Sequence, residues 1–390
     1  MKRQLGTIMI LLITVFLGFA IIIPIVPELI EEQDAGAIHL GLLLAIYSAV
    51  SFFMSPIWGK ISDRVGRKPI MMIGTIGFSA SFFIFGIGTE SLPLMYVSRI
   101  LGGMFSGAVT SCAVAYVADI TSEENRTKGM GLVGMSIGTG FVFGPVIGGL
   151  LSGLGNAVPF FVSAGLALLL FVFVARFLTE SLPPERRTQK GAPKVSRWTA
   201  FAGPMKFLYI LGFIIAFTMA GLESTFQLFQ SQRIGADAFD VGIMLGISGV
   251  IGALIQGGII RRYVKKGDEN KFILVGLILS SVGFFLLLLS DSFVTATIYL
   301  CVFSSGNALL RPCITSLITQ KTRVSQGIAS GLSSSMDSLG RIFGPLLATG
   351  LFHFEIGLPF VVGGVVCILG LGLLYGYMQV MRKEERTAAS

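Results

Sequence analysis

Residues 59–69 read GKISDRVGRKP, a short basic segment between two long apolar runs. The apolar runs, residues 39–59 and 69–88, each have about the 20 residues that an α-helix needs to cross the apolar core of a bilayer. Two membrane-spanning helices joined by a short loop are therefore predicted here. Since loops rich in lysine and arginine stay on the cytoplasmic side of a membrane, this loop is predicted to be cytoplasmic.

Composition extends this prediction to the whole chain. Of the 390 residues, 53% are hydrophobic and only 13% are charged, and the mean hydropathy is +0.82. A soluble domain carries about 25% charged residues because its surface faces water. A chain so poor in charge must be solvated by lipid, which predicts an all-α integral membrane protein.

Apolar runs separated by charged or turn-forming residues predict twelve transmembrane helices. The predicted spans are residues 5–28, 39–59, 69–88, 93–118, 128–151, 157–178, 205–230, 240–260, 272–289, 293–319, 327–352 and 358–380. Basic residues gather in alternate connections and at both termini, whereas the opposite connections carry a single basic residue, Arg233. Both termini are therefore predicted to be cytoplasmic, and the net charge of +8 reflects this orientation rather than nucleic-acid binding.

A pattern of four glycine and proline residues in the first half recurs 200 positions later. The first set is Gly131, Gly140, Gly144 and Pro145, and the second is Gly331, Gly340, Gly344 and Pro345. The repeat predicts a six-helix bundle over residues 1–178, a cytoplasmic linker over 179–204 and a second six-helix bundle over 205–390. Transporters built from such parallel repeats place the substrate site between the halves, near the middle of the bilayer.

The segment 59–69 also has chemistry of its own. Its glycines allow a tight turn, and Asp63 is placed to cap a helix N-terminus. Arg67 is placed to pair with a carboxylate at a cytoplasmic helix end, and Asp119, at the end of the fourth predicted span, is the candidate partner. Such an ion pair can hold one conformation and break in another. The alternative interpretation is a plain basic loop.

This segment resembles motif A of the major facilitator superfamily, GxLaDrxGRK, and three further segments are similar to other motifs of drug exporters. They are Leu17-Gly18-x5-Pro24-Ile-Val-Pro27 (the first-helix motif), Tyr96-Val-Ser-Arg99-Ile-Leu-Gly-Gly103 (motif B) and Gly131-x8-Gly140-x3-Gly144-Pro145-x2-Gly148-Gly149 (motif C). Together they resemble the DHA1 group of twelve-helix drug:proton antiporters, which includes bacterial multidrug exporters of the NorA and Bmr type.

The resemblance implies a proton-driven multidrug exporter in a bacterial plasma membrane, alternating between inward-open and outward-open states. It also implies a gate at the motif A positions and a ridge of close helix packing at the motif C positions. The gate residues are Gly59, Asp63, Arg64, Gly66, Arg67 and Asp119. The ridge residues are Gly131, Gly140, Gly144, Pro145, Gly148 and Gly149.

The clear cases of ionisable residues within the apolar spans, away from the span ends, are Arg99, Glu223, Arg311, Asp337 and Arg341. A charge at the centre of a membrane helix costs roughly 2.5–3.5 kcal/mol, so it usually faces a cavity or an opposite charge. Glu223 is the only carboxylate in its span, and we expect a proton and a cationic drug to compete for it. The alternative is a structural salt bridge. Arg99 either neutralises a nearby carboxylate during coupling or makes a purely structural pair.

The three charges near the end of the chain are open to two interpretations. Arg311 matches an arginine of NorA-like exporters, but the acid that precedes it there is replaced here by Ala308, next to Asn307. Asp337 and Arg341 are four residues apart and lie on one helical face. Either they neutralise each other, or Asp337 takes the place of the missing acid and Arg341 tunes it.

Aromatic side chains and one amide are candidates for the wall of the substrate cavity. They are Phe16, Phe19, Phe141, Phe226, Phe229 and Asn307. Aromatic walls with few polar anchors suit bulky amphipathic compounds. Helix packing and lipid contact are the commoner roles of phenylalanine and remain the alternative.

Other functional classes have less support in the sequence. It contains no Walker A motif, and its four cysteines and two histidines form no metal-ligand pattern, so neither a cofactor nor an enzymatic activity is predicted. Within transport, the alternatives are export of tetracycline or of an endogenous metabolite, sugar or lipid. A non-transporting membrane sensor is the alternative from another class. The predicted partners are drug-like small molecules, protons and the bilayer, and one chain holds both halves, so a monomer is sufficient.

Overall fold

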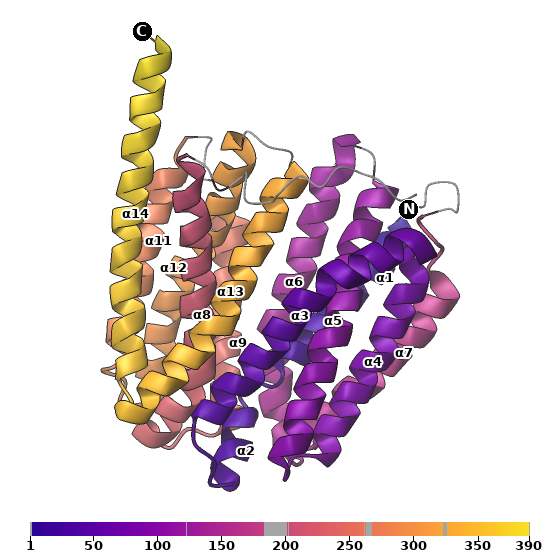
Figure 1. Cartoon of the computed structure of the whole chain (residues 1–390). Coiled ribbons are helices and arrows are strands. Elements are labelled where there is room, and N and C mark those ends of the chain that lie inside the picture. Colours follow the sequence, from indigo (N-terminus) through magenta and orange to yellow (C-terminus); the bar gives the residue numbers. More distant parts are fainter. Residues whose placement is uncertain are drawn as a thin grey trace. The chain divides into compact units, whose positions relative to one another are not determined.

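The computed structural model describes residues 2–121, 123–182, 201, 203–260, 262, 267–322 and 326–389, and this part of the chain is helical without a strand (Figure 1). The first helices are α1 (Lys2–Ala20), α2 (Val26–Glu32), α3 (Ile38–Val65), α4 (Arg67–Ile87), α5 (Leu92–Ile120), α6 (Glu123–Ser152) and α7 (Val158–Phe177). The later ones are α8 (Met205–Ile234), α9 (Ala238–Leu254), the π-helix η3 (Ile255–Ile260), α11 (Glu269–Leu287), α12 (Phe293–Lys321), α13 (Gln326–Phe354) and α14 (Leu358–Ala389).

Within the described residues, 11 helical segments are long and apolar enough to cross a membrane, which confirms a multi-span membrane protein. Helix α13 is not among them, although its 29 residues extend over about 43 Å at 1.5 Å per residue. Its mean hydropathy is lowered by Asp337, by Arg341 and by a run of serines over residues 333–335. The total of twelve spans and the cytoplasmic position of the termini stay predictions.

The first predicted span, residues 5–28, is wrong as a single helix. Helix α1 ends at Ala20, turns follow over residues 21–25, and the short helix α2 begins at Val26. Pro24 lies in this break, where it has no N–H to continue the helical hydrogen bonds and its ring clashes with the preceding turn. The helix therefore ends before this proline although the run of apolar residues continues beyond it.

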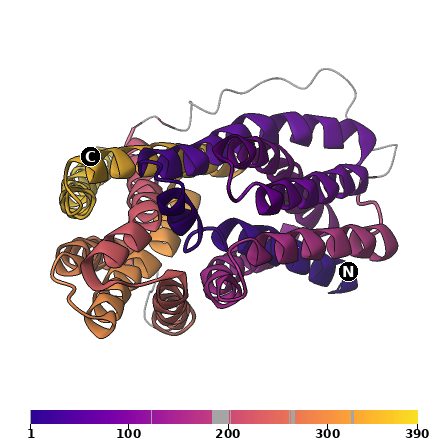
Figure 2. The ribbon, with the colours of Figure 1, turned by 90° about the horizontal axis from the view of Figure 1, so that it is seen from below.

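The helices group into two compact units. Unit 1 contains α1 to α7 and the segment Asp237–Ile243, which includes the start of α9. Unit 2 contains α8, the rest of α9 from Met244, and η3 to α14. In each unit the helices pack side by side as a bundle (Figure 2). The predicted limits of the two bundles stay a prediction, because residues 183–200 of the linker lie outside the described residues.

The repeated glycines give the two units the same kind of helix contact. A Cβ atom added to Gly140 of α6 would lie 2.7 Å from the carbonyl oxygen of Ile13 on α1. One added to Gly344 of α13 would lie 2.4 Å from the carbonyl oxygen of Phe217 on α8. Only glycine permits backbones to approach this closely, so α6 packs on α1 in unit 1 as α13 packs on α8 in unit 2.

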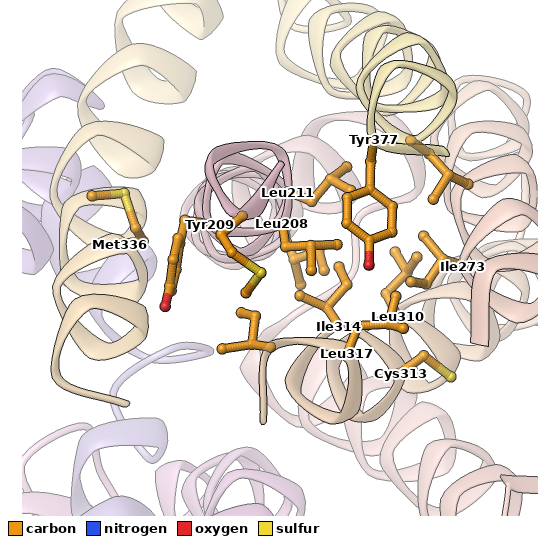
Figure 3. Close-up of a cluster of buried hydrophobic side chains, with 14 of the residues drawn as sticks. Leu208, Tyr209, Leu211, Ile273, Leu310, Cys313, Ile314, Leu317, Met336 and Tyr377 are labelled. Carbon is orange, nitrogen blue, oxygen red and sulfur yellow. The ribbon is translucent and has the colours of Figure 1, made fainter. Parts of the chain in front are cut away.

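The apolar core of unit 2 is built around α8, whose Leu208 and Leu211 are fully buried (Figure 3). Tyr209 also comes from α8, and the other members labelled in that view come from four further helices: Ile273 of α11, Leu310, Cys313, Ile314 and Leu317 of α12, Met336 of α13 and Tyr377 of α14. Since lipid tails are as apolar as leucine, such a cluster holds membrane helices by close packing rather than by removal from water. It fixes α8, α12 and α13, the helices that carry the membrane charges of this unit.

Candidate functional site

A tight turn at Gly66 joins α3 to α4 and positions the motif A residues. Gly66 has a φ of +115°, a conformation that side chains rarely adopt, so the turn requires glycine here. By contrast, a Cβ atom at Gly59 would meet nothing within 4 Å, so this glycine makes no close approach in the structure. Arg64 is exposed, whereas Arg67, the first residue of α4, is buried.

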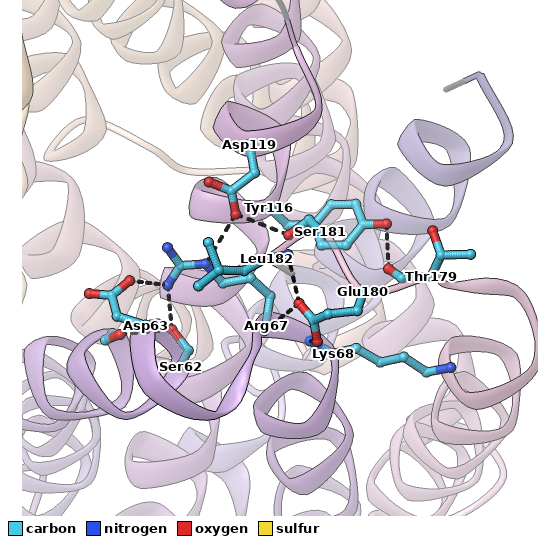
Figure 4. Close-up of polar contacts among 11 residues, drawn as sticks. Ser62, Asp63, Arg67, Lys68, Tyr116, Asp119, Thr179, Glu180, Ser181 and Leu182 are labelled. Carbon is cyan, nitrogen blue, oxygen red and sulfur yellow. Dashed lines mark hydrogen bonds and ion pairs between the residues drawn. The ribbon is translucent and has the colours of Figure 1, made fainter. Parts of the chain in front are cut away.

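Arg67 is held by two carboxylates and a hydroxyl (Figure 4). Its Nη1 lies 2.6 Å from Oδ1 of Asp63 and donates to Oγ of Ser62 at 2.6 Å. Its Nε lies 3.2 Å from Oδ2 of Asp119, at the end of α5. Two opposite charges and these hydrogen bonds compensate the guanidinium for the loss of water. The network therefore ties together the ends of α3, α4 and α5.

The carboxylate that caps α4 is Glu180, which the sequence did not single out. The backbone N–H groups of Arg67 and Lys68 donate to Oε1 and Oε2 of Glu180 at 2.8 and 3.1 Å. Asp63 does not take this role, because its carboxylate pairs with the Arg67 side chain. A negative charge at a helix N-terminus is favourable, so Glu180 ties the segment after α7 to the start of α4. Its only signal in the sequence is that it is an acid two residues after the end of the sixth predicted span.

The remaining motif C residues lie on α6, and its glycines have two different environments. A Cβ atom at Gly144 would lie 2.9 Å from the carbonyl oxygen of Leu17 on α1, and Pro145 lies inside the helix. A Cβ atom at Gly148 would lie 2.5 Å from the carbonyl oxygen of Ile21, and one at Gly149 would lie 2.6 Å from that of Ala238, at the start of α9. A Cβ atom at Gly131 would meet nothing within 4 Å, so this glycine lies outside the close packing. The ridge of tight contacts therefore begins after Gly131 and continues to the end of α6.

Glu28 on α2 also contacts the first turn of α9 within unit 1. The backbone N–H of Ala238 donates to Oε1 of Glu28 at 2.5 Å. Burial raises the pKa of Glu28 above its ordinary value of 4.5, the hydrogen bond from Ala238 opposes this, and the nearby charges of Asp237 and Glu32 add to the increase. In the sequence, Glu28 is only one of several acids near an external connection, and nothing there singles it out.

Unit 2 carries a counterpart of the Arg67 network in which an amide and a hydroxyl, rather than an arginine, bind the carboxylate. Gly267 has a φ of +104° just before α11, as Gly66 has before α4. The buried Glu269 accepts hydrogen bonds from Gln320 at 2.8 Å and from Ser316 at 3.2 Å, both on α12. Gly267 and Gln320 each lie 201 positions after their counterparts in unit 1, Gly66 and Asp119. The repeat therefore includes this helix connection. In unit 1 the acid lies on the second helix, α5, whereas in unit 2 it lies on the first, α11, and its partner Gln320 lies on the second, α12.

Four of the five membrane charges come together in unit 2. Arg341 of α13 lies 3.8 Å from Glu223 of α8, and Arg311 of α12 donates to Asp337 of α13 at 2.8 Å. Asp337 and Arg341 are one helical turn apart, so the four groups form a row of alternating charges from three helices. Each of the two α13 charges thus has a partner on another helix. Exposure of the side chains rises along the row, from 7% for Glu223 to 22% for Arg341, 33% for Asp337 and 47% for Arg311.

Arg99 lies in unit 1 and is enclosed by aromatic rings. Its guanidinium carbon is 4.6 Å from the ring centroid of Phe85, 5.5 Å from that of Phe82 and 5.7 Å from that of Tyr47. Its Nη2 donates to Oγ of Ser98 at 3.3 Å, and no ion pair of Arg99 occurs among the described residues. The side chain is 1% exposed, so ring faces supply the negative potential that a carboxylate would supply elsewhere.

Three of the predicted cavity residues form an aromatic cluster that reaches the ring of Tyr47 beside Arg99. The ring centroid of Phe141 on α6 lies 5.5 Å from that of Phe16 and 5.7 Å from that of Phe19, both on α1. Phe19 lies 5.0 Å from Tyr47 on α3. Edge-to-face and tilted contacts at these distances are favourable. The cluster links α1, α3 and α6 within unit 1.

The predicted cavity residues of unit 2 do not share one environment. Phe226 and Phe229 are fully buried, and Phe229 packs on Phe360 with ring centroids 4.5 Å apart. In this structure they fill the space between helices rather than line an opening. Asn307 of α12 is half-buried, one turn before Arg311.

Known proteins that resemble the chain agree on its family. The sequence model of the Major Facilitator Superfamily matches residues 8–332 and again 267–390. The chain is 34% identical to "Multidrug resistance protein 2" of Bacillus subtilis (strain 168), with 100% of both chains covered. It is 32% identical to "Multidrug resistance protein 1" of the same organism, with 96% of each covered. It is 29% identical to "Quinolone resistance protein NorA" of Staphylococcus aureus (strain MRSA252), covering 99% of this chain and 98% of NorA.

Solved transporter structures share the fold. The human organic anion transporter MFSD10 (TETRAN) matches with a TM-score of 0.72 and 25% identity, over 96% of this chain and 99% of that one. A bacterial homolog of the human lysosomal transporter Spinster, in an inward-facing and unoccupied conformation, matches with a TM-score of 0.78 over 98% of both chains. Its identity of 14% supports the fold alone. The chain therefore belongs to the Major Facilitator Superfamily and is a membrane transporter rather than an enzyme.

Proposed function

We propose that this transporter exports amphipathic drugs across a bacterial plasma membrane in exchange for protons, by alternating access. Support comes from relatives in Bacillus and Staphylococcus that are named for multidrug or quinolone resistance and align over almost the whole chain. Since one chain contains both units, we propose that it works as a monomer.

The observation that carries the proposal is the environment of Glu223. The carboxylate belongs to a membrane-spanning helix, is almost fully buried, and has one arginine, Arg341, at 3.8 Å. A separation of 3.8 Å is longer than a normal hydrogen bond, so the pair is close enough to attract and loose enough to separate. A buried carboxyl group that gains a proton leaves no negative charge in an apolar interior. Glu223 therefore suits a site that a proton can occupy and leave.

Exchange follows if proton and drug exclude one another at Glu223. In the unprotonated state the carboxylate attracts Arg341 and the cationic part of a drug. In the protonated state it attracts neither strongly, so the drug leaves and Arg341 can move with α13. Each ligand thus stabilises the site in place of the other, which is the thermodynamic requirement for antiport.

Two features of unit 1 fit the conformational part of the cycle. The network of Arg67 with Asp63 and Asp119 joins three helix ends at one end of the unit, and we assign it the role of a gate that breaks in the other state. Arg99 is positioned by rings rather than by an acid, so its charge stays available to a carboxylate that approaches only during transport. Both roles are proposals.

The test is a drug-susceptibility panel in a bacterial strain that lacks its own major exporters. Expression of the wild-type chain should raise the inhibitory concentration of several amphipathic drugs, and Glu223→Gln should abolish the increase. Glu90→Gln serves as the matched control because Glu90 is exposed between α4 and α5. Resistance from Glu223→Gln equal to that of wild type would reject the role of Glu223. No resistance from the wild type to any compound would favour export of an endogenous metabolite, sugar or lipid, or a sensor.

A further inference from the structure

A narrow hollow lies in unit 2 between α8, α11, α13 and α14. Its volume, with the open mouth included, is about 310 Å³. On α8 it extends from Phe217 to Thr225, which corresponds to about 12 Å along the helix. Phe284, near the end of α11, and Pro359, near the start of α14, also line it. The hollow therefore lies toward the end of unit 2 at which α14 begins, the end that is predicted to be extracellular.

The walls of the hollow offer no free polar group to a ligand. Among the described residues that line it, only Thr218 and Thr225 have polar side chains. Both hydroxyls donate to carbonyl oxygens of their own helix, Thr218 to Ile214 at 2.8 Å and Thr225 to Gly221 at 3.0 Å. The other lining side chains are aliphatic or aromatic, or the residue is glycine. An occupant of the hollow is therefore apolar and is held by packing.

Gly221, in the floor of the hollow, leaves space that helix packing does not require. A Cβ atom there would lie 3.4 Å from Cβ of Ala348 and 3.4 Å from the carbonyl oxygen of Gly344, which are ordinary contact distances. By contrast, a Cβ atom at Gly344 would lie 2.4 Å from the carbonyl oxygen of Phe217. Atoms that line an empty space lose their dispersion contacts on that side. An apolar occupant beside Gly221 restores these contacts.

The mouth of the hollow is continuous with the apolar surface of the unit. Leu347 of α13 lines the hollow and is 46% exposed, and Val362 of α14 is half-buried beside it. The same two helices expose Phe343 and Val365. Since α14 is a membrane-spanning segment, apolar side chains exposed on it are solvated by lipid tails. Lipid therefore has direct access to the hollow.

We propose that the hollow binds one acyl chain of a phospholipid from the leaflet at this end of unit 2. Half of an apolar core about 30 Å thick is about 15 Å, so the hollow has nearly the length of an acyl chain within one leaflet. Sites for small molecules have volumes of roughly 300–1,000 Å³, so a hollow at the lower limit suits a narrow, flexible chain better than a polycyclic drug. The site is independent of the proposed export function.

A bound acyl chain contacts the two helices that carry the Glu223–Arg341 pair. Gly221 lies two residues before Glu223 on α8, and Gly344 lies three residues after Arg341 on α13. The acyl chain also contacts α14, so it joins three helices of unit 2 at once. A ligand that binds only the folded state stabilises it, so the acyl chain stabilises the packing of α8, α13 and α14.

The test is photo-crosslinking of the purified full-length protein in phosphatidylcholine nanodiscs. A small fraction of the lipid carries a diazirine near the methyl end of one acyl chain, and mass spectrometry of peptides locates the adducts. In the wild type, adducts should be denser at residues 217–225 and 344–351 than at residues 365–369 of α14. That stretch exposes Val365, Ile368 and Leu369 and lies outside the hollow, so it measures ordinary contact with lipid.

The variant Gly221→Val fills the hollow from its floor and should lower the adducts at residues 344–351 to the level at 365–369. Gly212→Val on the same helix is the matched control, because a Cβ atom at Gly212 meets nothing within 4 Å and this residue lies outside the hollow. Val362→Phe enlarges a half-buried side chain at the mouth and should have the same effect as Gly221→Val. It provides a second variant if Gly221→Val does not fold.

A second measurement is the thermal midpoint of lipid-depleted protein in detergent. Adding phosphatidylcholine should raise the midpoint of wild type and of Gly212→Val more than that of Gly221→Val. Adducts in the wild type that are no denser in the hollow than at residues 365–369 would overturn the inference. So would undiminished adducts in both Gly221→Val and Val362→Phe, or cross-links from Leu347 to a second copy of the protein in place of lipid adducts.

Discussion

The substitution Gly140→Ala tests whether the glycine ridge of α6 sets the distance to α1. The added methyl group would lie 2.7 Å from the carbonyl oxygen of Ile13, 2.7 Å from Cβ of Phe16 and 2.8 Å from the amide nitrogen of Leu17. Two of these three atoms are backbone, so a change of rotamer does not relieve the clash and the helices must separate. Gly131→Ala on the same helix is the matched control, since its methyl group meets nothing within 4 Å.

The magnitude follows from comparing the two variants. Overpacking of a close contact costs about 1–3 kcal/mol. Replacing a helical glycine by alanine also increases the free energy of unfolding by about 1 kcal/mol, because alanine has the higher helix propensity. Both variants gain this amount, so it cancels when they are compared. The free energy of unfolding of Gly140→Ala should therefore lie about 1–3 kcal/mol below that of Gly131→Ala, with wild type between them or close to Gly140→Ala.

The measurement is the thermal midpoint of the purified chain in detergent, followed by intrinsic fluorescence. For a unit of 150–250 residues, each kcal/mol of difference in the free energy of unfolding shifts the thermal midpoint by roughly 2–4 °C. Equal midpoints for the two alanine variants would refute the claim that Gly140 is required by a close approach. A higher midpoint for Gly140→Ala would show that α1 and α6 are farther apart than in this structure.

Three further predictions concern acids at helix ends. Burial raises the folded-state pKa of Glu28 above 4.5, so the folded state favours the protonated carboxyl group and the free energy of unfolding should fall as the pH rises above 4.5. The variant Glu28→Gln should lack this fall, and thermal midpoints of the two proteins that stay parallel from pH 4 to pH 8 would contradict the prediction. Glu180→Ala removes the cap of α4 and should lower the free energy of unfolding by about 0.5–2 kcal/mol, measured by thermal melting, whereas Glu90→Ala at an exposed position should not. Gln320→Leu deprives the buried Glu269 of a donor and should cost about 1–3 kcal/mol in the same assay, so a melting curve like that of wild type would speak against the hydrogen bond.

The parts of the fold that depend on local sequence could be predicted. Span length and loop charge are properties of short windows, and the structure has helices where the runs of apolar residues predicted them. The Arg67–Asp119 contact could be proposed because Asp119 is one of few acids at a span end that is predicted to be cytoplasmic. The break at Pro24 could not be read from hydropathy, since the residues around it are all apolar. It depends on the missing N–H of proline, which hydropathy does not measure.

The partners of the membrane charges in unit 2 could not be predicted, because they depend on how helices rotate against each other. The four-residue spacing of Asp337 and Arg341 indicates a shared helical face but does not reveal that α8 and α12 each contribute an opposite charge to that face. Glu180 was missed for a related reason. It lies 113 positions after Arg67, and only the packing of α7 beside α4 brings the two together.

The most direct test of the account is proton movement through the purified protein in proteoliposomes that contain a pH-sensitive dye and carry an imposed pH gradient. If a proton and a drug compete for Glu223, adding a transported amphipathic drug should evoke proton flux through the wild-type chain, and Glu223→Gln should abolish this flux while Glu90→Gln leaves it intact. Drug transport without any accompanying proton flux, or an undiminished flux in Glu223→Gln, would contradict the claim that a proton and a drug compete for Glu223.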